Sequence, residues 1–491
     1  MKKEKIKNIW IKYQKVLLVS FFFFLFCYGI KLFTYSYSLD TESFMIYKDS
    51  FLNSWLQINR FSLVALKEIF SFFPFNIYVT NWITVLIFYL ASVFTYFNFA
   101  RICQKIREPK KAFFFLAVIG SSPIFLEQFN FTLQSAEIAF FFLLFQIGMY
   151  FFQKYFEEHK KYHAVLTILI LFACLGAYQS FAPLYIAETI IFLFITITSK
   201  KIKKNKEILN YIFRAILIFL LSFFLYFLVS KILLNMLNLN SNSYLTSQIS
   251  WLHTPLKTSI FRIIKSIAYI YFGGGYFVSR YVHFTFLNLF VLILGLKESI
   301  KYFKKKKYVL AILILMILAS PLIMTFLLGN HEPVRAQFTL PIVISFLLTY
   351  MWIDKKSFTV LVTFFIIGQV LVMGTLQYSD YIRFQNDKIM AEEIYEDVKE
   401  YLPNRKLVIV GAKDSDVEGK IKVRGEAMGI SFFDHYGVSD RSTTFMKTLN
   451  YPIEDDRSYI KEATELVKDL ETYPSENSIF VNDQYVIVKL S

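Results

Sequence analysis

Apolar runs of about 18 residues or more recur along this chain between Val16 and Leu376. Each run is long enough to cross a hydrocarbon core of about 30 Å as a helix. Because 56% of the 491 residues are also hydrophobic, the composition is typical of a polytopic membrane protein and not of a soluble one. The first run follows the basic leader 1–15 and precedes no small-residue cleavage site, so we expect an uncleaved anchor.

The linkers between the runs alternate between rich and poor in Lys and Arg. Basic residues in short loops stay on the cytoplasmic side, so this alternation predicts a cytoplasmic N-terminus and about eleven transmembrane helices, with the C-terminus outside. The linkers rich in Lys and Arg are 1–15, 101–111, 153–163, 199–206, 297–307 and 354–356. The linkers with few Lys and Arg residues are 36–75, 127–134, 178–183, 236–283 and 329–335. The expected spans are 16–34, 76–99, 112–127, 133–152, 163–178, 182–198, 208–235, 284–297, 308–328, 335–353 and 357–377.

The segment 254–281 is apolar enough to touch lipid, but counting it as a span would break the alternation. Its FRIIKSIAYIYF stretch predicts an amphipathic helix on the outer surface, with a flexible break at Gly273, Gly274 and Gly275. An ordinary span kinked by these glycines is the alternative.

The composition changes after Leu376. Residues 379–491 carry 22 acidic and 15 basic side chains, against 15 acidic and 38 basic before them. We therefore divide the chain into a multispanning domain, 1–378, and a small extracytoplasmic α/β domain, 379–491. The tail pattern predicts a helix at 387–402, a strand at 406–411, a helix at 456–473 and a hairpin at 478–490.

The sequence shows no motif for a disulfide, a metal site, a nucleotide site or a nucleophilic serine. The three cysteines, Cys27, Cys103 and Cys174, lie in or beside spans and imply no disulfide. His159 and His163 have the i, i+4 spacing of a metal pair, but they lie in a Lys-rich linker on the expected cytoplasmic side. No Gly-rich phosphate loop or nucleophile elbow is found. We expect no nucleotide site and no cofactor, and leave a divalent metal open.

The stretch SLDTES, residues 38–43, places Asp40 and Glu42 where the chain leaves the first span. One interpretation is that Asp40 or Ser43 caps the next helix. The other is catalytic. The following segment, 43–73, belongs to the external loop 35–75 and is too polar to span the membrane. The spacing of its apolar residues predicts a helix that lies on the outer leaflet and covers a cavity. Two carboxylates at its mouth are suited to chemistry on a lipid-borne substrate.

A carboxylate in this position can act as general base for an acceptor hydroxyl that attacks C1 of a sugar. The leaving group would be a phosphate on a lipid carrier, whose charge is best met by the bidentate fork of an arginine. Arg60 and Arg335 are the candidates on the external side, with anchoring at lipid headgroups as the alternative role.

Short motifs in this order resemble the Gtr type II glucosyltransferase family: LDTE at 39–42, the W-x4-R element from Trp55 to Arg60, YQSF at 178–181, the late external Arg335 and the acidic tail. The family has a glycine just before the arginine, where Asn59 stands here. The resemblance implies a GT-C-like membrane glycosyltransferase that uses polyprenyl-phosphate sugars. It implies that Asp40 is the acidic residue of the first external loop, with Glu42 as the alternative.

Further candidates for substrate binding are polar residues on or near the external side: Glu127, Glu137, Tyr178, Gln179 and His331. Tyr178 and Gln179 are suited to sugar hydroxyls, or alternatively cap a tight turn. Glu137 and Glu188 lie inside expected spans, where each should face a cavity or a partner such as Arg214.

The most economical function is transfer of a glucosyl or related hexosyl residue from a polyprenyl-phosphate donor to a surface polysaccharide or lipid-linked glycan, on the outer face of the cell membrane. A separate donor synthase and flippase would supply the donor, and nucleic acid has no part. A polysaccharide polymerase or ligase and a lipid-linked saccharide transporter are the alternatives, although carriers commonly show internal repeats and none is evident here.

Overall fold

The computed structural model describes residues 2–202, 204–240, 242, 247–273, 282–415, 423–434 and 439–491. The chain forms two compact units. Unit 1 comprises Met1–Leu32, Leu52–Phe129 and Gln134–Gly374, and unit 2 comprises Phe33–Phe51, Asn130–Leu133 and Thr375–Ser491. Unit 2 thus contains the loop that bears Asp40 and Glu42 together with the whole tail, 379–491.

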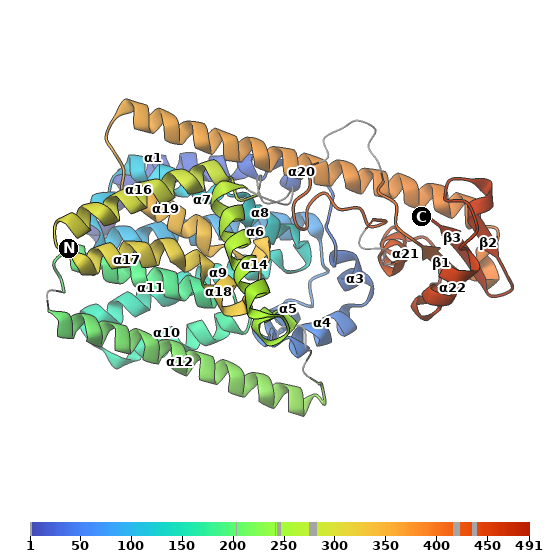
Figure 1. The fold of residues 1–491 in the computed structure, drawn as a ribbon, viewed down its shortest axis with the longest axis horizontal. Helices are drawn as coiled ribbons and strands as arrows, with labels where there is room; N and C mark the ends of the chain where they lie inside the picture. Colours follow the sequence, from blue (N-terminus) through green and yellow to red (C-terminus); the bar gives the residue numbers. More distant parts are fainter. Residues whose placement is uncertain are drawn as a thin grey trace. The chain divides into compact units, whose positions relative to one another are not determined.

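Unit 1 is built from helices, and its long helices lie roughly alongside one another (Figure 1). Their bounds are α1 Lys2–Cys27, α5 Phe61–Ile69, α6 Ile77–Ile102, α7 Pro109–Gly120, α8 Pro123–Asn130, α9 Thr132–Glu158, α10 Lys161–Leu175, α11 Phe181–Thr198, α12 Asn205–Met236, α14 Leu256–Phe272, α16 Thr285–Lys304, α17 Tyr308–Ala319, α18 Ile323–Leu328 and α19 Thr339–Tyr350. Three more helices, the short α2 Gly29–Phe33, α4 Lys48–Gln57 and the long α20 Lys356–Val398, extend beyond the bounds of unit 1, as do the end of α8 and the start of α9.

The described helices include six that are long and apolar enough to cross a membrane: α6, α9, α11, α12, the stretch Tyr308–Leu328 and α20. The pair α7 and α8, bent by 45° at the break between them, would make a seventh. Every expected span overlaps a helix, and large apolar side chains of α12 such as Phe213 and Phe227 are exposed. These features support a helical membrane protein. The number of eleven spans stays a prediction.

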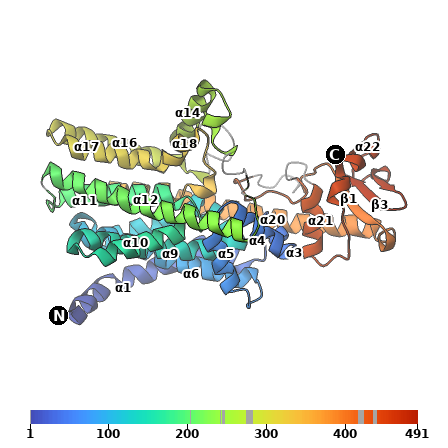
Figure 2. The same ribbon diagram turned by 90° about the horizontal axis from the view of Figure 1, so that it is seen from below.

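The segment α14 runs across the direction of α11 and α12 in both ribbon views (Figure 2). It ends where Gly273 takes a left-handed conformation with φ of 68°, which glycine adopts without a steric penalty. Gly274 and Gly275 lie outside the described residues. The transverse course of α14 favours the interpretation as an interfacial helix.

The prediction of one helix over 43–73 is wrong, because this segment forms three helices: α3 Thr41–Ile46, α4 Lys48–Gln57 and α5 Phe61–Ile69. The break after α4 is a Schellman cap. Arg60 N donates to Trp55 O at 2.9 Å, Asn59 N donates to Leu56 O at 2.9 Å, and Asn59 has a φ of 64°. Trp55 to Arg60 is therefore a helix terminus, and a left-handed residue just before the arginine explains why glycine or asparagine is suitable there.

The described part of unit 2 contains a three-stranded sheet in the order β1, β3, β2, formed by β1 Lys406–Val410, β2 Ile479–Val481 and β3 Tyr485–Lys489. β1 and β3 are parallel, and β2 and β3 form the predicted antiparallel hairpin. α21 Ser439–Thr448 and α22 Ile460–Leu466 belong to the same unit. A core of Val408, Val410, Ala463, Val467 and Ile487 joins α22 to the sheet.

Two tail helices differ from prediction. The span 357–377 and the helix 387–402 were expected to be separate, yet α20 is one helix of 43 residues, because YSDYIRFQN at 378–386 contains neither Gly nor Pro. The helix expected over 456–473 is limited to a 3-10 turn, Arg457–Tyr459, and α22. α22 ends at Leu466, and the next residue, Val467, has a side chain that is fully buried in the sheet core.

Candidate functional site

The loop that carries Asp40 and Glu42 is fixed within unit 2 by a cluster of aromatic rings. The Tyr37 ring lies 4.8 Å from that of Phe384 and 5.8 Å from that of Phe432, which stacks on Phe445 of α21 at 4.3 Å. Ser38 Oγ donates to the Asn130 carbonyl at 2.6 Å. Burial of large rings is a strong apolar contribution, so the chain just before Asp40 has a defined course.

Arg441, on α21, bridges the two carboxylates. Its Nη2 donates to Asp40 Oδ1 at 2.6 Å, and its Nη1 donates to Glu42 Oε1 at 2.8 Å. Asp40 stands at the N-cap position of α3 with a left-handed φ of 72°, but its side chain makes no cap hydrogen bond. The interpretation of Asp40 as a capping side chain is therefore wrong, because this carboxylate is held by the arginine.

The two carboxylates lie in different environments. The Asp40 side chain is 36% exposed, whereas the Glu42 side chain is fully buried. Burial raises the pKa of Glu42 to about 7, although the charge of Arg441 acts in the opposite direction. Glu42 Oε2 is buried and, among the described residues, has no hydrogen-bond partner. Paired acids with contrasting surroundings are typical of acid–base sites.

Further cations from the tail surround α3. Lys447 Nζ donates to the Tyr47 hydroxyl at 3.0 Å and forms an ion pair with Asp455. The Arg457 guanidinium lies 4.8 Å from the centre of the Tyr47 ring. With Arg441, these residues bring three cations close to the acid pair, and each of them is paired with a carboxylate.

A second group of candidates meets in unit 1, around the Schellman cap. The Arg60 guanidinium lies 4.7 Å from the centre of the Tyr178 ring, and its Nη1 donates to Gln134 Oε1 at 3.4 Å. Gln179 Nε2 donates to the Ile58 carbonyl at 3.0 Å and to the Tyr226 hydroxyl at 3.1 Å. The structure thus brings Arg60, Tyr178 and Gln179 together, with Trp55 buried beside them at the end of α4.

Gly176 shows why these two distant segments approach so closely. Its carbonyl accepts a hydrogen bond from Ser62 N at 2.9 Å, and an added Cβ would lie 2.5 Å from the Phe61 ring. Only a glycine leaves room for α5 at this point.

His331 and Arg335 lie in the linker after α18. His331 Nδ1 is 3.3 Å from Ser266 Oγ on α14, and burial, with a contribution from His283, lowers the pKa of His331 to about 4. The imidazole is therefore neutral at pH 7. Arg335 is half-buried in a 3-10 turn, Val334–Ala336.

A family model described as Glucosyl transferase GtrII matches residues 29–351. The chain belongs to the GtrII glucosyl transferase family. This confirms the resemblance based on LDTE, W-x4-R, YQSF and Arg335, and it shows that the chain is a glycosyltransferase family member. No curated protein matches the chain. The matched range includes Asp40, Glu42 and Arg60 but ends before Arg441, so the arginine that bridges the acids lies outside the matched range.

The remaining acidic candidates of this GtrII family member lie in unit 1, where Glu127 and Glu188 are buried and Glu137 is partly buried. Glu127 on α8 is fully buried. Glu137 forms an ion pair with Lys67, 2.7 Å from Nζ to Oε1, and Glu188 accepts from Gln146 Nε2 at 2.6 Å. The suggested partner Arg214 is wrong for both, because Arg214 Nε instead donates to Asn210 on the exposed part of α12.

The described residues contain no group of three or more His, Cys, Asp or Glu side chains that could hold a metal ion. Asp40 and Glu42 supply oxygen ligands of the kind that hard cations prefer, but Arg441 already meets both of them. His159 has a left-handed φ of 56° between α9 and α10, so it does not share one helix face with His163.

Sequence reasoning missed Arg441, Lys447 and Arg457. It treated the tail as a separate domain, and no spacing pattern links residue 441 to residues 40 and 42. The charged residues of an acidic tail ordinarily face water, so nothing in the local sequence distinguishes these three cations.

Proposed function

We propose that this GtrII family member transfers a glucosyl or related hexosyl residue from a polyprenyl-phosphate donor to a surface polysaccharide or lipid-linked glycan, on the outer face of the membrane. The observation that carries the proposal is the acid pair Asp40 and Glu42, bridged by Arg441 just after the first apolar helix. The family match supports glucosyl transfer, and the apolar helices support a lipid-borne donor. The same match weighs against the transporter and polymerase alternatives.

In the proposed reaction, the acceptor hydroxyl oxygen attacks C1 of the donor sugar while the bond between C1 and the phosphate oxygen breaks. Polyprenyl phosphate leaves with the bonding electrons, and the hydroxyl proton passes to the Asp40 carboxylate. Asp40 is the better base because its side chain reaches solvent, whereas Glu42 is enclosed. Glu42 and Arg441 orient the loop. No protein-bound cofactor is needed, and separate proteins would make and flip the donor.

Arg60 and Arg335 are the proposed phosphate ligands from unit 1. The Arg60 guanidinium lies over the Tyr178 ring. This contact fixes the orientation of the guanidinium before a phosphate binds. Six residues of unit 1 are proposed to bind substrate as well: Tyr178, Gln179, Glu127, Glu137, Trp55 and His331.

Arg335→Lys is expected to lower transfer about tenfold, in keeping with loss of one charge-assisted hydrogen bond of about 1.5 kcal/mol. An ammonium keeps the charge but cannot copy the bidentate fork of guanidinium. Arg335→Ala should lower transfer further. Initial rates with a glucosyl polyprenyl phosphate donor measure both, and Arg262→Lys on α14 is the matched control. Full activity of both Arg335 variants would assign this residue to headgroup anchoring.

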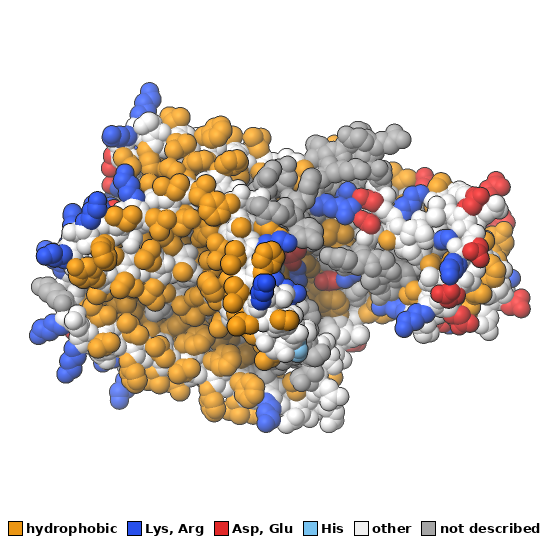
Figure 3. Space-filling view, viewed as in Figure 1, with side chains coloured by type: hydrophobic (Ala, Val, Ile, Leu, Met, Phe, Trp, Pro, Cys, Tyr) orange, Lys and Arg blue, Asp and Glu red, His pale blue; other side chains and the backbone are white. Residues whose placement is uncertain are grey.

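The proposed multipass topology places the N-terminus in the cytoplasm and residues 379–491 outside. The side of unit 1 that faces the viewer is covered by hydrophobic side chains, with Lys and Arg along one end, as the basic linkers require (Figure 3).

Labelling of single introduced cysteines tests this topology. The three native cysteines are buried, so background labelling should be low. Asn477→Cys, at an exposed position in the tail, should react with an impermeant maleimide in intact cells, while Ser199→Cys, exposed between α11 and α12, should react only after permeabilisation. The reverse pattern would overturn the orientation and the outer-face reaction with it.

The function itself is tested by the composition of the surface glycan. Cells that lack this protein should lose a side-branch glucose or related hexose, and reintroduction of the wild-type chain should restore it. An unchanged glycan, together with no transfer from a polyprenyl-phosphate donor in membranes, would refute the proposal.

A further inference from the structure

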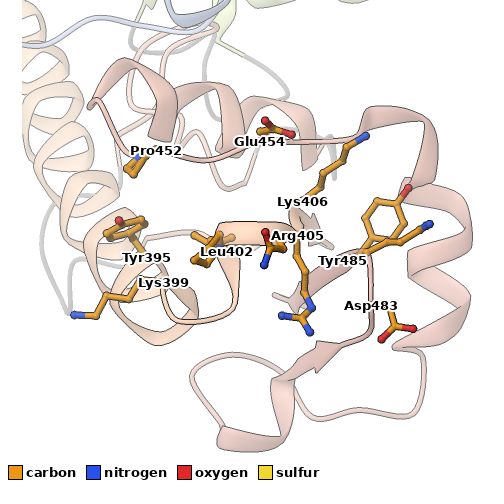
Figure 4. Close-up of a pocket in the computed structure, with 12 residues that line it drawn as sticks. Tyr395, Lys399, Leu402, Arg405, Lys406, Pro452, Glu454, Asp483 and Tyr485 are labelled. Atoms are coloured by element: carbon orange, nitrogen blue, oxygen red, sulfur yellow. The ribbon is translucent and has the colours of Figure 1, made fainter.

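Unit 2 has an open groove of about 770 Å³ between the end of α20, the 3-10 turn Leu402–Asn404 and the turn between β2 and β3 (Figure 4). Its volume is within the range of small-molecule and cofactor sites. The lining residues are Tyr395, Lys399, Leu402, Pro403, Asn404, Arg405, Lys406, Pro452, Glu454, Asp483, Gln484 and Tyr485. Neither the two carboxylates bridged by Arg441 nor any other candidate site residue is among them.

The groove combines aromatic rings with groups that both donate and accept hydrogen bonds. Tyr395 and Tyr485 lie on opposite sides, with Leu402 and Arg405 between them (Figure 4). The amides of Asn404 and Gln484 each offer a donor and an acceptor. A ligand with many hydroxyl groups and apolar C–H faces uses both features, since its hydroxyls meet the amides and its C–H faces meet the rings.

The cations of the groove are already engaged with other groups of the protein. Lys399 pairs with Glu396, Lys406 lies 3.4 Å from Asp456, and Arg405 donates to the Asn482 carbonyl. A phosphate would have to compete for these donors, whereas a neutral saccharide need not. The lining residues Glu454 and Asp483 further disfavour an anion.

The groove is connected to the acid pair through three consecutive residues. Asp456 accepts from Tyr485 of the groove at 3.2 Å. Its neighbour Asp455 accepts from Thr443 of α21 at 3.0 Å, and Arg457 stacks on Tyr47, next to α3. Tyr485, which lines the groove, therefore contacts a segment that also contacts α21, the helix of Arg441, and Tyr47 at the end of α3.

We propose that this groove is a saccharide-binding subsite that holds a portion of the acceptor glycan away from the carboxylates that act on it. The proposal rests on the proposed function, because it takes the acceptor to be a polysaccharide. Binding at a distance from the reacting hydroxyl would favour a chain over a single sugar.

Direct binding to the full-length protein in detergent tests the subsite independently of transfer. The probe is a set of oligosaccharides cut from the surface polysaccharide of cells that lack this protein, followed by saturation-transfer NMR and titration. Asn404→Ala and Gln484→Ala should each weaken binding about tenfold, as expected for loss of a hydrogen-bonding group worth about 1.4 kcal/mol. Asn477→Ala is the matched control, since Asn477 is also exposed and lies in the 3-10 turn Glu476–Ser478.

In transfer assays the same two variants should raise KM for the oligosaccharide acceptor while kcat stays close to wild type. Equal binding by wild type, both groove variants and Asn477→Ala would overturn the subsite. Absence of binding to wild type, or displacement of the oligosaccharide by inorganic phosphate, would also overturn it. Binding that is lost in the groove variants, in a protein that shows no transfer, would support the subsite and refute the proposed function instead.

Discussion

Asp40→Asn should lower sugar transfer by about 10²-fold or more, the usual contribution of a positioned general base. Asparagine keeps the size of the side chain and tolerates the left-handed conformation that residue 40 adopts, with φ of 72°. It can still accept a hydrogen bond from Arg441 but cannot take up the proton of the acceptor hydroxyl. Protein level should therefore remain near wild type while initial rates fall in membranes supplied with a glucosyl polyprenyl phosphate.

Two further variants show whether the effect belongs to Asp40. Glu42→Gln should lower the transfer rate less than Asp40→Asn does if Glu42 only orients the loop. It should lower the rate more if Glu42 is the base. Asp49→Asn is the matched control, because Asp49 is an exposed carboxylate in the first turn of α4. Near-normal transfer by both Asp40→Asn and Glu42→Gln would exclude the catalytic role of this pair.

The positions of helices followed from sequence because each depends on local composition. A long apolar run must form its hydrogen bonds internally in lipid, so runs such as 76–99 and 208–235 indicate helices whatever surrounds them. The strand 406–411 and the hairpin 478–490 are likewise marked by apolar β-branched residues and the Asn-Asp-Gln turn. Local signals were sufficient for these elements.

Only the acidic half of the candidate site could be predicted from the sequence. The sequence marks Asp40 and Glu42 because carboxylates are conspicuous after an apolar run. Their partner Arg441 lies about 400 residues away, and tertiary contacts such as the packing of Tyr37 against Phe384 and Phe432 bring the two segments of unit 2 together. Such contacts depend on tertiary structure, which no periodicity reports.

Backbone conformation was a second obstacle. The continuous helix expected over 43–73 fails at Asn59, where one left-handed residue closes a Schellman cap and redirects the chain before Arg60. Asparagine is compatible with both a helix end and a loop, so the residue alone does not fix the break. Arg60, directly after the cap, lies against the Tyr178 ring. The position of this candidate phosphate ligand therefore depends on the conformation of one residue, Asn59.

Arg441→Ala should abolish most of the activity and destabilise unit 2. It leaves Glu42, which is fully buried, without the charge that compensates its burial, and breaking a buried ion pair typically costs about 3–5 kcal/mol. Arg441→Lys should retain only part of the activity. The ammonium keeps the positive charge, but a single point charge is poorly suited to bridge two carboxylates. Thermal unfolding of the purified protein and initial transfer rates measure the two effects, with Lys461→Ala on α22 as an exposed cation control.

The pH dependence and a double variant separate a positioning role for Arg441 from a purely structural one. Arg441 holds the pKa of Glu42 below the value that burial alone would give, so its removal should raise that pKa further above about 7. If the ionised form of Glu42 is needed, activity of Arg441→Ala should then reach half its maximum at a higher pH than in wild type. Adding Glu42→Gln to Arg441→Ala should restore thermal stability, since no charge remains buried, yet leave transfer low. Recovery of transfer along with stability in the double variant would show that Arg441 only offsets the burial of Glu42 and does not position Asp40 for proton abstraction.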